Sequence, residues 1–256
     1  RPARLIELWN KVLENDEHDD KALVALTSLY EREERWQALA EILQRRINQV
    51  GDKRERVQAR KKLGTLLAER LGREDRAMAV WEQALDEDPE NAEIFKILRD
   101  RLVKAKSFEA LEGLYAKREK WEEYVDVLVV QAEALTDSEE KTRVYFQISD
   151  VWENRLQRKD RAARVYERIL EIDPKNVRAA ESLRPIFEKG SEWKKLTTVE
   201  EVLAAAATDP KDRAARHRRI GKLYEEKLRR PSDAFVYVAK ALEDDPAEAG
   251  GIAKLE

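Results

Sequence analysis

Few side chains in this sequence could exchange protons near neutral pH. Among unperturbed side chains only histidine serves that purpose, and the chain contains two, His18 and His217. His18 stands in the acidic run NDEHDD and His217 in the basic run RAARHRRIGK, and neither has a second histidine or a cysteine nearby to complete a metal site. Both are therefore interpreted as solvated surface residues. With no glycine-rich phosphate loop and no serine elbow motif, we expect no enzyme, no cofactor and no metal.

Two further residue groups could bind ligands. The acidic clusters ENDEHDD and LDEDPE could attract Ca²⁺, but both lack the spaced oxygen ligands and the central glycine of a calcium loop. The six tryptophans could form an aromatic cage, yet they occur at recurring helix positions, which favours packing. These residue types therefore identify no ligand site, and the pattern of helices that carries them is more informative about the protein.

The composition is that of a mostly helical chain. Charged residues make up 40% and hydrophobic residues 42%, with only 8 Gly and 7 Pro. The 50 basic and 53 acidic residues are finely interspersed and give a net charge of -3, so no global field indicates nucleic acid or an acidic membrane. Apolar runs are far shorter than the ~20 residues that a membrane span needs. The absence of cysteine excludes a disulfide framework.

One stretch of sequence occurs twice. RKDRAARVYERILEIDPKN (158–176) and REDRAMAVWEQALDEDPEN (73–91) agree at ten of nineteen positions. Related stretches begin near residue 4 and at residue 230, and the aspartates that mark the following turn are Asp16, Asp88, Asp173 and Asp245. Their spacings are 72, 85 and 72, and a spacing of 72 is two units of about 36 residues, close to the ~34-residue period of helix-turn-helix solenoids.

Two other patterns recur in the same register. YEREERWQALAEIL (30–43), YAKREKWEEYVDVL (115–128) and FEKGSEWKKLTTVE (187–200) each place an aromatic residue six positions before a Trp, which predicts a tight turn between them. In each unit a small residue stands thirteen positions before an alanine of the repeated stretch. At these small residues, which are Gly64, Ser149 and Gly221, two helices are expected to approach closely. Asn91 and Asn176 follow the Asp-Pro turns and are expected to cap helices.

These residues resemble the tetratricopeptide repeat family over nearly the whole chain. The second-helix pattern of that family is matched by Ala77, Trp81, Ala84 and Pro89, and the first-helix pattern by Ile220-Gly221 with Tyr224. The leading Trp of the family is absent, and alternate units begin with a Trp variant. The resemblance implies an all-α fold, a right-handed superhelical solenoid of antiparallel helix pairs. We expect residues 1–256 to form one such domain, as part of a longer chain.

The long interval predicts an irregularity. Trp36 and Trp193 each lie 20 residues after their marker aspartate, but the equivalent position in the middle repeat is Phe108, and Trp121 follows thirteen residues later. One additional helix between Phe108 and Trp121 is the simplest explanation. An odd helix disturbs regular stacking, so a break near residues 104–121 is expected.

The resemblance also implies where a partner would bind. The basic runs KRERVQARKK (53–62) and RAARHRRIGK (213–222) lead into first helices, which in this family line the concave face. The inward positions carried over from the family, with Arg143 one turn before Phe146, are Lys61, Thr65, Glu69, Arg143, Phe146, Asp150, Asn154, Arg218, Lys222 and Glu226. The carboxylate clamp of the family is not reproduced, because its asparagine position carries Thr65, Asp150 or Lys222.

The leading hypothesis is a non-enzymatic scaffold that binds a peptide or helix of another protein on its concave face. RNA binding through the basic first helices is the alternative, although the balanced charge argues against it. A docking or regulatory arm of a larger protein is a third reading. Self-association through the ends of the solenoid stays open. A cytoplasmic location is expected, and export stays open because the chain begins Arg1-Pro2 without Met.

Overall fold

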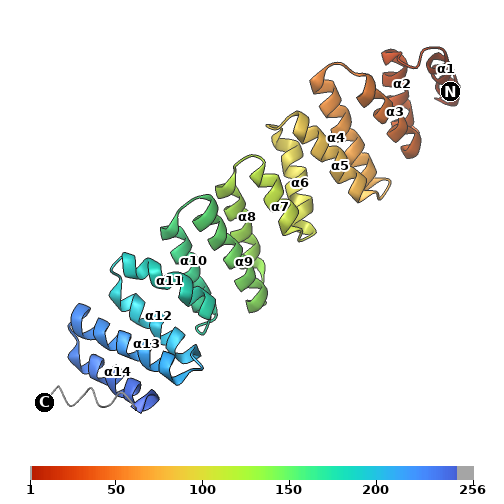
Figure 1. Cartoon of the computed structure of the whole chain (residues 1–256). Coiled ribbons are helices and arrows are strands. Elements are labelled where there is room, and N and C mark those ends of the chain that lie inside the picture. Colours follow the sequence, from red (N-terminus) through yellow and green to blue (C-terminus); the bar gives the residue numbers. More distant parts are fainter. Residues whose placement is uncertain (1, 247–256) are drawn as a thin grey trace. The chain divides into compact units, whose positions relative to one another are not determined.

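The computed structural model describes residues 2–246, and that part of the chain contains fourteen α-helices and no β-strand. The predicted all-α class is thereby confirmed. The chain divides into two compact units, Arg1–Arg118 and Glu119–Glu256. Within each unit, helices that follow one another in sequence lie side by side and are joined by short turns (Figure 1). The repeating element is therefore the helical hairpin.

Unit 1 contains seven helices in its described part. They are α1 (Pro2–Asn15), α2 (Asp20–Arg32), α3 (Trp36–Gln49), α4 (Lys53–Glu69), α5 (Glu74–Glu87), α6 (Ala92–Lys104) and α7 (Phe108–Ala116). Each helix buries an apolar stripe against its neighbours, such as Leu23 and Leu26 of α2 against α3. No hairpin could bury its stripe alone, which is the physical reason for the repetition.

Unit 2 contains a further seven α-helices among its described residues, and two of them run into short π-helical segments. They are α8 (Trp121–Ala134), α9 (Ser138–Asp150) with η1 (Val151–Arg155), α10 (Lys159–Ile172), α11 (Val177–Lys189), α12 (Trp193–Ala206), α13 (Pro210–Lys222) with η2 (Leu223–Lys227), and α14 (Pro231–Asp244). The π segments widen the last turn before the reversal into α10 or α14.

The predicted turns between an aromatic residue and a Trp are present. Glu34 and Ser191 stand in the left-handed region, with φ of 53° and 57°. In the first of these turns Arg35 N donates to Tyr30 O (2.9 Å), and Glu192 N makes the equivalent bond in the second. These bonds satisfy carbonyls at the helix end and reverse the chain within a few residues. The Trp then opens the next helix, as the spacing predicts.

The other predicted local features are also confirmed. Asn91 accepts a hydrogen bond from Ile94 N (3.1 Å) and caps α6, while Asn176 accepts one from Ala179 N (3.0 Å) and caps α11. Gly64 lies under the indole of Trp81, where α4 and α5 approach closely. Small residues are needed at such positions because a side chain would occupy the space of the neighbouring helix.

The long interval of the repeat contains one short helix. α7 is nine residues long and begins at Phe108, with Ser107 N donating to Leu102 O (3.0 Å) in the same turn geometry that precedes Trp36. The expected additional helix is therefore present. The boundary between the two compact units falls after Arg118, inside the interval 104–121. A single continuous solenoid over residues 1–256, and a change of direction in it, stay predictions.

Candidate functional site

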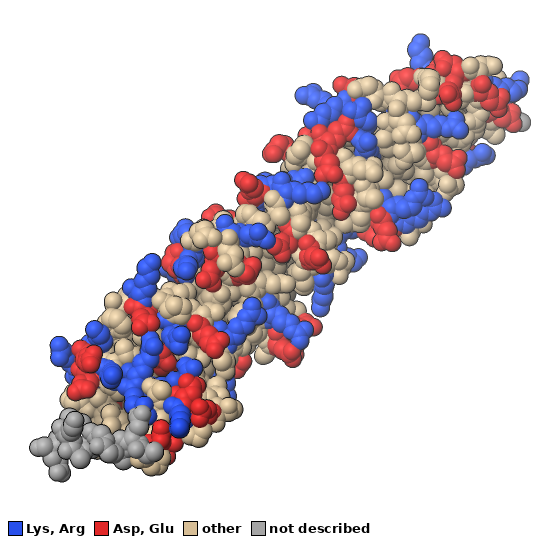
Figure 2. Space-filling view, viewed as in Figure 1, with Lys and Arg blue, Asp and Glu red and all other residues tan. Residues whose placement is uncertain are grey.

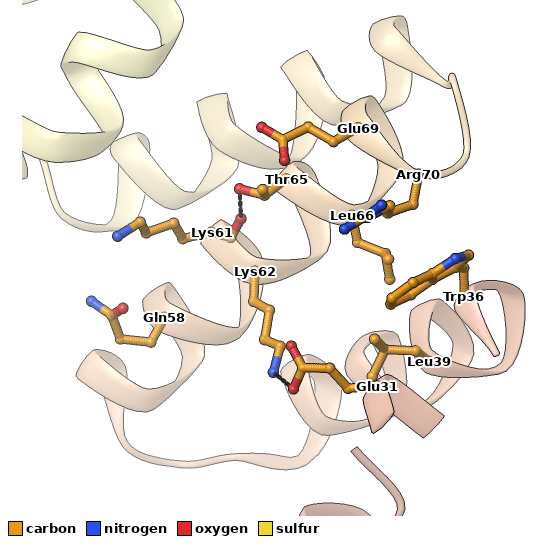
Figure 3. Close-up of a pocket in the computed structure, with 10 residues that line it drawn as sticks. All are labelled: Glu31, Trp36, Leu39, Gln58, Lys61, Lys62, Thr65, Leu66, Glu69 and Arg70. Atoms are coloured by element: carbon orange, nitrogen blue, oxygen red, sulfur yellow. Dashed lines mark hydrogen bonds and ion pairs between the residues drawn. The ribbon is translucent and has the colours of Figure 1, made fainter. Parts of the chain in front are cut away.

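Helix α4, the first helix of its hairpin, carries three of the predicted positions, Lys61, Thr65 and Glu69. All three line one groove of unit 1. Asp52 caps this helix by accepting a hydrogen bond from Glu55 N (2.9 Å), and a spacing of four places side chains on one helix face. The groove has a volume of about 580 Å³ (Figure 3). It is lined by Glu31, Trp36, Leu39, Gln58, Lys61, Lys62, Thr65, Leu66, Glu69 and Arg70.

One end of this groove is apolar. Trp36, at the start of α3, lies beside Leu39 and Leu66 in the close-up (Figure 3). The guanidinium of Arg70 lies 4.9 Å from the centre of the indole ring. Trp36 is half-buried rather than part of a closed core. An apolar side chain from a ligand could therefore cover the exposed part of the indole.

The rest of the groove lining is polar. Lys62 Nζ pairs with Glu31 of α2 (2.6 Å), and Thr65 Oγ1 donates to the carbonyl oxygen of Lys61 (3.1 Å) (Figure 3). That bond uses the only proton of the Thr65 hydroxyl. Toward a ligand, the hydroxyl oxygen can therefore act only as a hydrogen-bond acceptor. The Gln58 amide also lines the groove and has no hydrogen bond in the part of the chain described. These groups suit the backbone of an extended peptide.

Two of the predicted positions on α4 form ion pairs with α6, the first helix of the next hairpin. Lys61 Nζ pairs with Glu93, and Glu69 lies 3.7 Å from Arg101 Nη2, both partners being on α6. Positions eight residues apart on α4 thus meet oppositely charged positions eight residues apart on α6. These two side chains stiffen the face of α4 and α6, and a ligand would compete with α6 for their charges.

The predicted positions on α9 lie in unit 2. Arg143 is exposed and pairs with Glu139 of the same helix (2.5 Å). The Phe146 ring is 6.2 Å from the ring of Tyr166, and the guanidinium of Arg178 lies 4.1 Å over its face. Phe146 is therefore covered on one side by a cation from α11, which the sequence analysis did not identify.

The remaining positions of α9 and η1 bind each other, because the Asn154 amide donates to Asp150 (2.6 Å).

Three residues beside the predicted positions were missed from the sequence, namely Trp36, Arg70 and Arg178. A regular signal was available for the first two. A cation lies against the ring of each helix-opening Trp, and it always stands thirty-four residues later, in the pairs Trp36–Arg70, Trp121–Arg155 and Trp193–Lys227.

The predicted positions of α13 and η2 are less enclosed. Arg218 Nη2 lies 4.0 Å from Asp245, whereas Lys222 and Glu226 are exposed. None of these three residues lines the groove of unit 1. The structure therefore brings together the positions of α4, and separately those of α9, but it does not join all ten into one pocket of either unit.

Two arginines of the basic run that begins α4 are paired within unit 1. Arg56 and Arg60 both form ion pairs with Glu87 at the end of α5. Arg56 also donates to the carbonyl oxygen of Val50 (2.7 Å), which holds the turn into α4. The hydrogen bond from Arg56 is the main cause that holds the pKa of Glu87 below its ordinary value. These cations stabilise the hairpin.

The basic run of α13 is arranged in the same way, and it corrects the interpretation of one histidine. Arg213 pairs with Asp244 of α14 (2.5 Å), and His217 Nδ1 lies 2.8 Å from the second oxygen of that carboxylate. The side chain of His217 is only 15% exposed, so its interpretation as a solvated surface residue is wrong. His18 is 69% exposed, as expected. The bond from Arg213 is the main cause that lowers the pKa of Asp244.

A buried carboxylate takes up two more cations of α13. Glu200 of α12 is 1% exposed, and its oxygens lie 3.6 Å from Arg216 Nη1 and 2.9 Å from Arg219 Nε. The periodicity of α13 alone gives no sign of this acceptor, which comes from the preceding hairpin. Arg219 also pairs with Glu188 of α11 (2.9 Å), so the run RAARHRRIGK links α13 to acids of α11, α12 and α14.

Charges of both signs are intermixed over the visible face of each unit (Figure 2). Among residues 2–246, no three acidic or histidine side chains are grouped so that they could hold a metal ion. The helices in this range are also too short or too polar to cross a membrane. The candidate binding features of the described residues are therefore the grooves and the ion pairs.

Comparison with known proteins identifies one repeat. Residues 22–57, which include α2, α3 and the start of α4, match the family model of the tetratricopeptide repeat. No curated protein matches the chain. Similar solved structures include the TPR2AB domain of yeast Sti1 in complex with pHSP90, at 17% identity, covering 92% of this chain and 90% of that chain, with a TM-score of 0.38.

Two further solved structures are similar at the same level. YrrB, described as a TPR protein with an unusual peptide-binding site, has 16% identity, covers 81% of this chain and 94% of that chain, and has a TM-score of 0.30. The C-terminal part of a TPR repeat-containing protein from Cytophaga hutchinsonii has 15% identity, covers 100% of this chain and 95% of that chain, and has a TM-score of 0.34. Likenesses this distant do not bear on ligands. Residues 22–57 thus match one tetratricopeptide repeat, and the described helices on either side of it continue as helical hairpins.

Proposed function

We propose that this chain is a non-enzymatic scaffold that binds a peptide or helix of another protein on its first helices. The observation that carries the proposal is the groove of unit 1, because three positions expected to bind a partner, Lys61, Thr65 and Glu69, line it together. The groove combines an apolar wall at Trp36 with hydrogen-bonding groups at Thr65. A linear peptide presents both kinds of surface, whereas a small polar metabolite lacks the first.

The pairing of the cations favours a protein partner over RNA. Arg56 and Arg60 share Glu87, and Arg213 is held by Asp244. An RNA phosphate would have to displace these carboxylates before it gained a contact. The seven predicted positions on α9, η1, α13 and η2 remain part of the proposal as a second part of the binding surface, and the cytoplasm remains the expected location.

The histidines support a role without catalysis. His217 is engaged with Asp244, and His18 stands alone on an exposed turn. Neither faces the groove of unit 1, whose lining contains no histidine. We therefore expect binding without turnover.

The proposal can be tested with short random peptides displayed on phage and selected on the immobilised chain. Thr65→Trp fills the groove from its half-buried lining position, and it should weaken binding of a group of selected peptides at least about tenfold. Gln44→Trp is the matched control, because Gln44 is exposed on α3 and does not line the groove.

Circular dichroism of both variants shows whether the fold is kept. If no peptides are enriched, or if every enriched peptide binds the Thr65→Trp variant and the wild type equally well, the groove of unit 1 is not a peptide site. Loss of binding in both tryptophan variants would likewise contradict the assignment.

A further inference from the structure

A larger groove lies in unit 2, and none of the positions expected to bind a partner lines it. It has a volume of about 770 Å³ and is formed by α10, the end of α11 and the start of α12, with one residue from η1. It is lined by Glu153, Lys159, Asp160, Ala163, Arg164, Glu167, Pro185, Ile186, Phe187, Lys189, Gly190, Glu192 and Lys195. α10 and α12 are the second helices of their hairpins, and the end of the first helix α11 lies between them in the lining.

The floor of this groove is apolar. Ala163 and Phe187 are buried, Ile186 is half-buried, and Pro185 is exposed. Pro185 lies inside α11, where it provides no backbone N–H. The floor could therefore cover an aliphatic or aromatic side chain of a ligand without leaving a donor at that position unsatisfied.

Three carboxylates of the rim form ion pairs or hydrogen bonds with cations. Lys195 Nζ pairs with both Glu167 (2.7 Å) and Glu192 (3.1 Å). Asp160 accepts two hydrogen bonds from Arg158, each 3.0 Å long. Each of these three acids is thus engaged, but Lys195 and Arg158 supply two positive charges against three carboxylates, which leaves this group with a net charge of −1.

The fourth acid is engaged as well. Glu153 accepts a hydrogen bond from the Tyr166 hydroxyl (3.1 Å) and lies 4.0 Å from Lys159. Two cations of the rim are different, since Arg164 and Lys189 have no carboxylate partner among the described residues. The first turns of α10 and α12 also line the groove and add the positive ends of two helices. Together with Arg158, the lining has five cations and four carboxylates, so the rim around the apolar floor has a positive excess of one charge, and its unpaired cations are Arg164 and Lys189.

We propose that the groove of α10, α11 and α12 binds an acidic linear segment of a partner protein that presents an apolar side chain. The apolar side chain would rest on Ile186 and Pro185, and flanking carboxylates would pair with Arg164 and Lys189. Bonds of this kind between a cation and a carboxylate are stronger than neutral ones and give the segment its direction. This surface is independent of the groove of unit 1, so the chain could hold two segments at once.

The test uses the same phage-displayed peptides, sorted by their dependence on charge. Arg164→Glu combined with Lys189→Glu reverses the two unpaired cations. One group of selected peptides, rich in Asp and Glu around an aliphatic or aromatic residue, should lose at least about tenfold in affinity for this variant. The same group should bind Thr65→Trp as well as it binds the wild type, which separates this groove from that of unit 1.

Lys175→Glu combined with Lys194→Glu is the matched control. Both lysines are exposed, lie near the same hairpin and do not line the groove, and the change in net charge is identical. Acidic peptides that bind both double variants equally weakly would show a general charge effect and overturn the proposal. Absence of any acidic group among the selected peptides would overturn it too.

Sedimentation of the free chain completes the test. If the chain forms dimers that Arg164→Glu with Lys189→Glu abolishes, the occupant is a second copy and the proposed partner is wrong. A monomer in both cases, together with the loss of acidic peptides, supports the proposal.

Discussion

The indole of Trp81 lies directly against the α-carbon of Gly64, and its Nε1 donates a hydrogen bond to the carbonyl oxygen of Lys61 (3.3 Å). Trp81 is 1% exposed, so the contact closes the interface between α4 and α5. A methyl group at Gly64 would stand 2.7 Å from Trp81 Cδ1. The contact therefore fixes both the spacing of this hairpin and the helix that carries Lys61 and Thr65.

Gly64→Ala should lower the free energy of unfolding by about 1–3 kcal/mol, because the packed indole must move. Urea unfolding followed by circular dichroism measures the change. Gly113→Ala in α7 is the control, since an added methyl group there meets nothing within 4 Å. That control should gain about 0.5–1 kcal/mol, because alanine is the better helix former. Equal stability of the Gly64 variant and the wild type would contradict the close contact.

The pair of Arg56 with Glu87 predicts a loss of stability in acid. The pKa of Glu87 is lower in the folded state than its ordinary value, mainly because Arg56 donates to it. Its stabilising effect is therefore complete above the ordinary carboxyl pKa of about 4.3 and is lost as the pH falls through the lower folded value. Urea midpoints measured from pH 7 to pH 3 should fall more steeply for the wild type than for Glu87→Gln.

Asp86→Asn is the control for that experiment, because Asp86 forms only an exposed pair with Lys117 (3.3 Å). Its pH profile should follow that of the wild type. Parallel profiles for Glu87→Gln and the wild type would show that the Arg56 pair does not couple proton binding to folding.

Arg219→Ala should destabilise unit 2, because the buried carboxylate of Glu200 then keeps only the more distant Arg216 as its cation. A buried acceptor left without a partner costs about 1–3 kcal/mol. Lys222→Ala on the same helix is exposed and should change stability by less than about 0.5 kcal/mol. Thermal and urea unfolding of the two variants provide the comparison, and equal effects would mean that Glu200 is satisfied by other means.

Arg70→Gln should remove the cation that covers Trp36 at 4.9 Å. An exposed cation–π contact contributes about 0.5–1 kcal/mol, so urea unfolding should detect a loss of that size. Arg45→Gln is the control, because Arg45 is exposed on α3 and has no ring contact among the described residues. A larger loss in the control than in Arg70→Gln would exclude a contribution of the pair.

The amino-acid sequence by itself determined the local structure. The Asp-Pro-Asn turns predict the caps at Asn91 and Asn176, and the spacing of Tyr30 and Trp36 predicts the turn between α2 and α3. Gly64 likewise predicts a close approach of two helices. These features depend on residues within one hairpin, where the chain geometry fixes which side chains meet.

Only the tertiary structure decided which charges are free. The partners of Lys61, His217 and Arg219 come from other helices, twenty-seven or more residues away in the case of Glu93 and Asp244. The groove of α10, α11 and α12 is likewise assembled from helix ends that no periodic pattern links. A helix presents its charges along a face, but the stacking of neighbouring hairpins determines which of them meet an opposite charge. For that reason the basic runs predict a binding surface from sequence, and the structure shows that most of their charges hold the helices together.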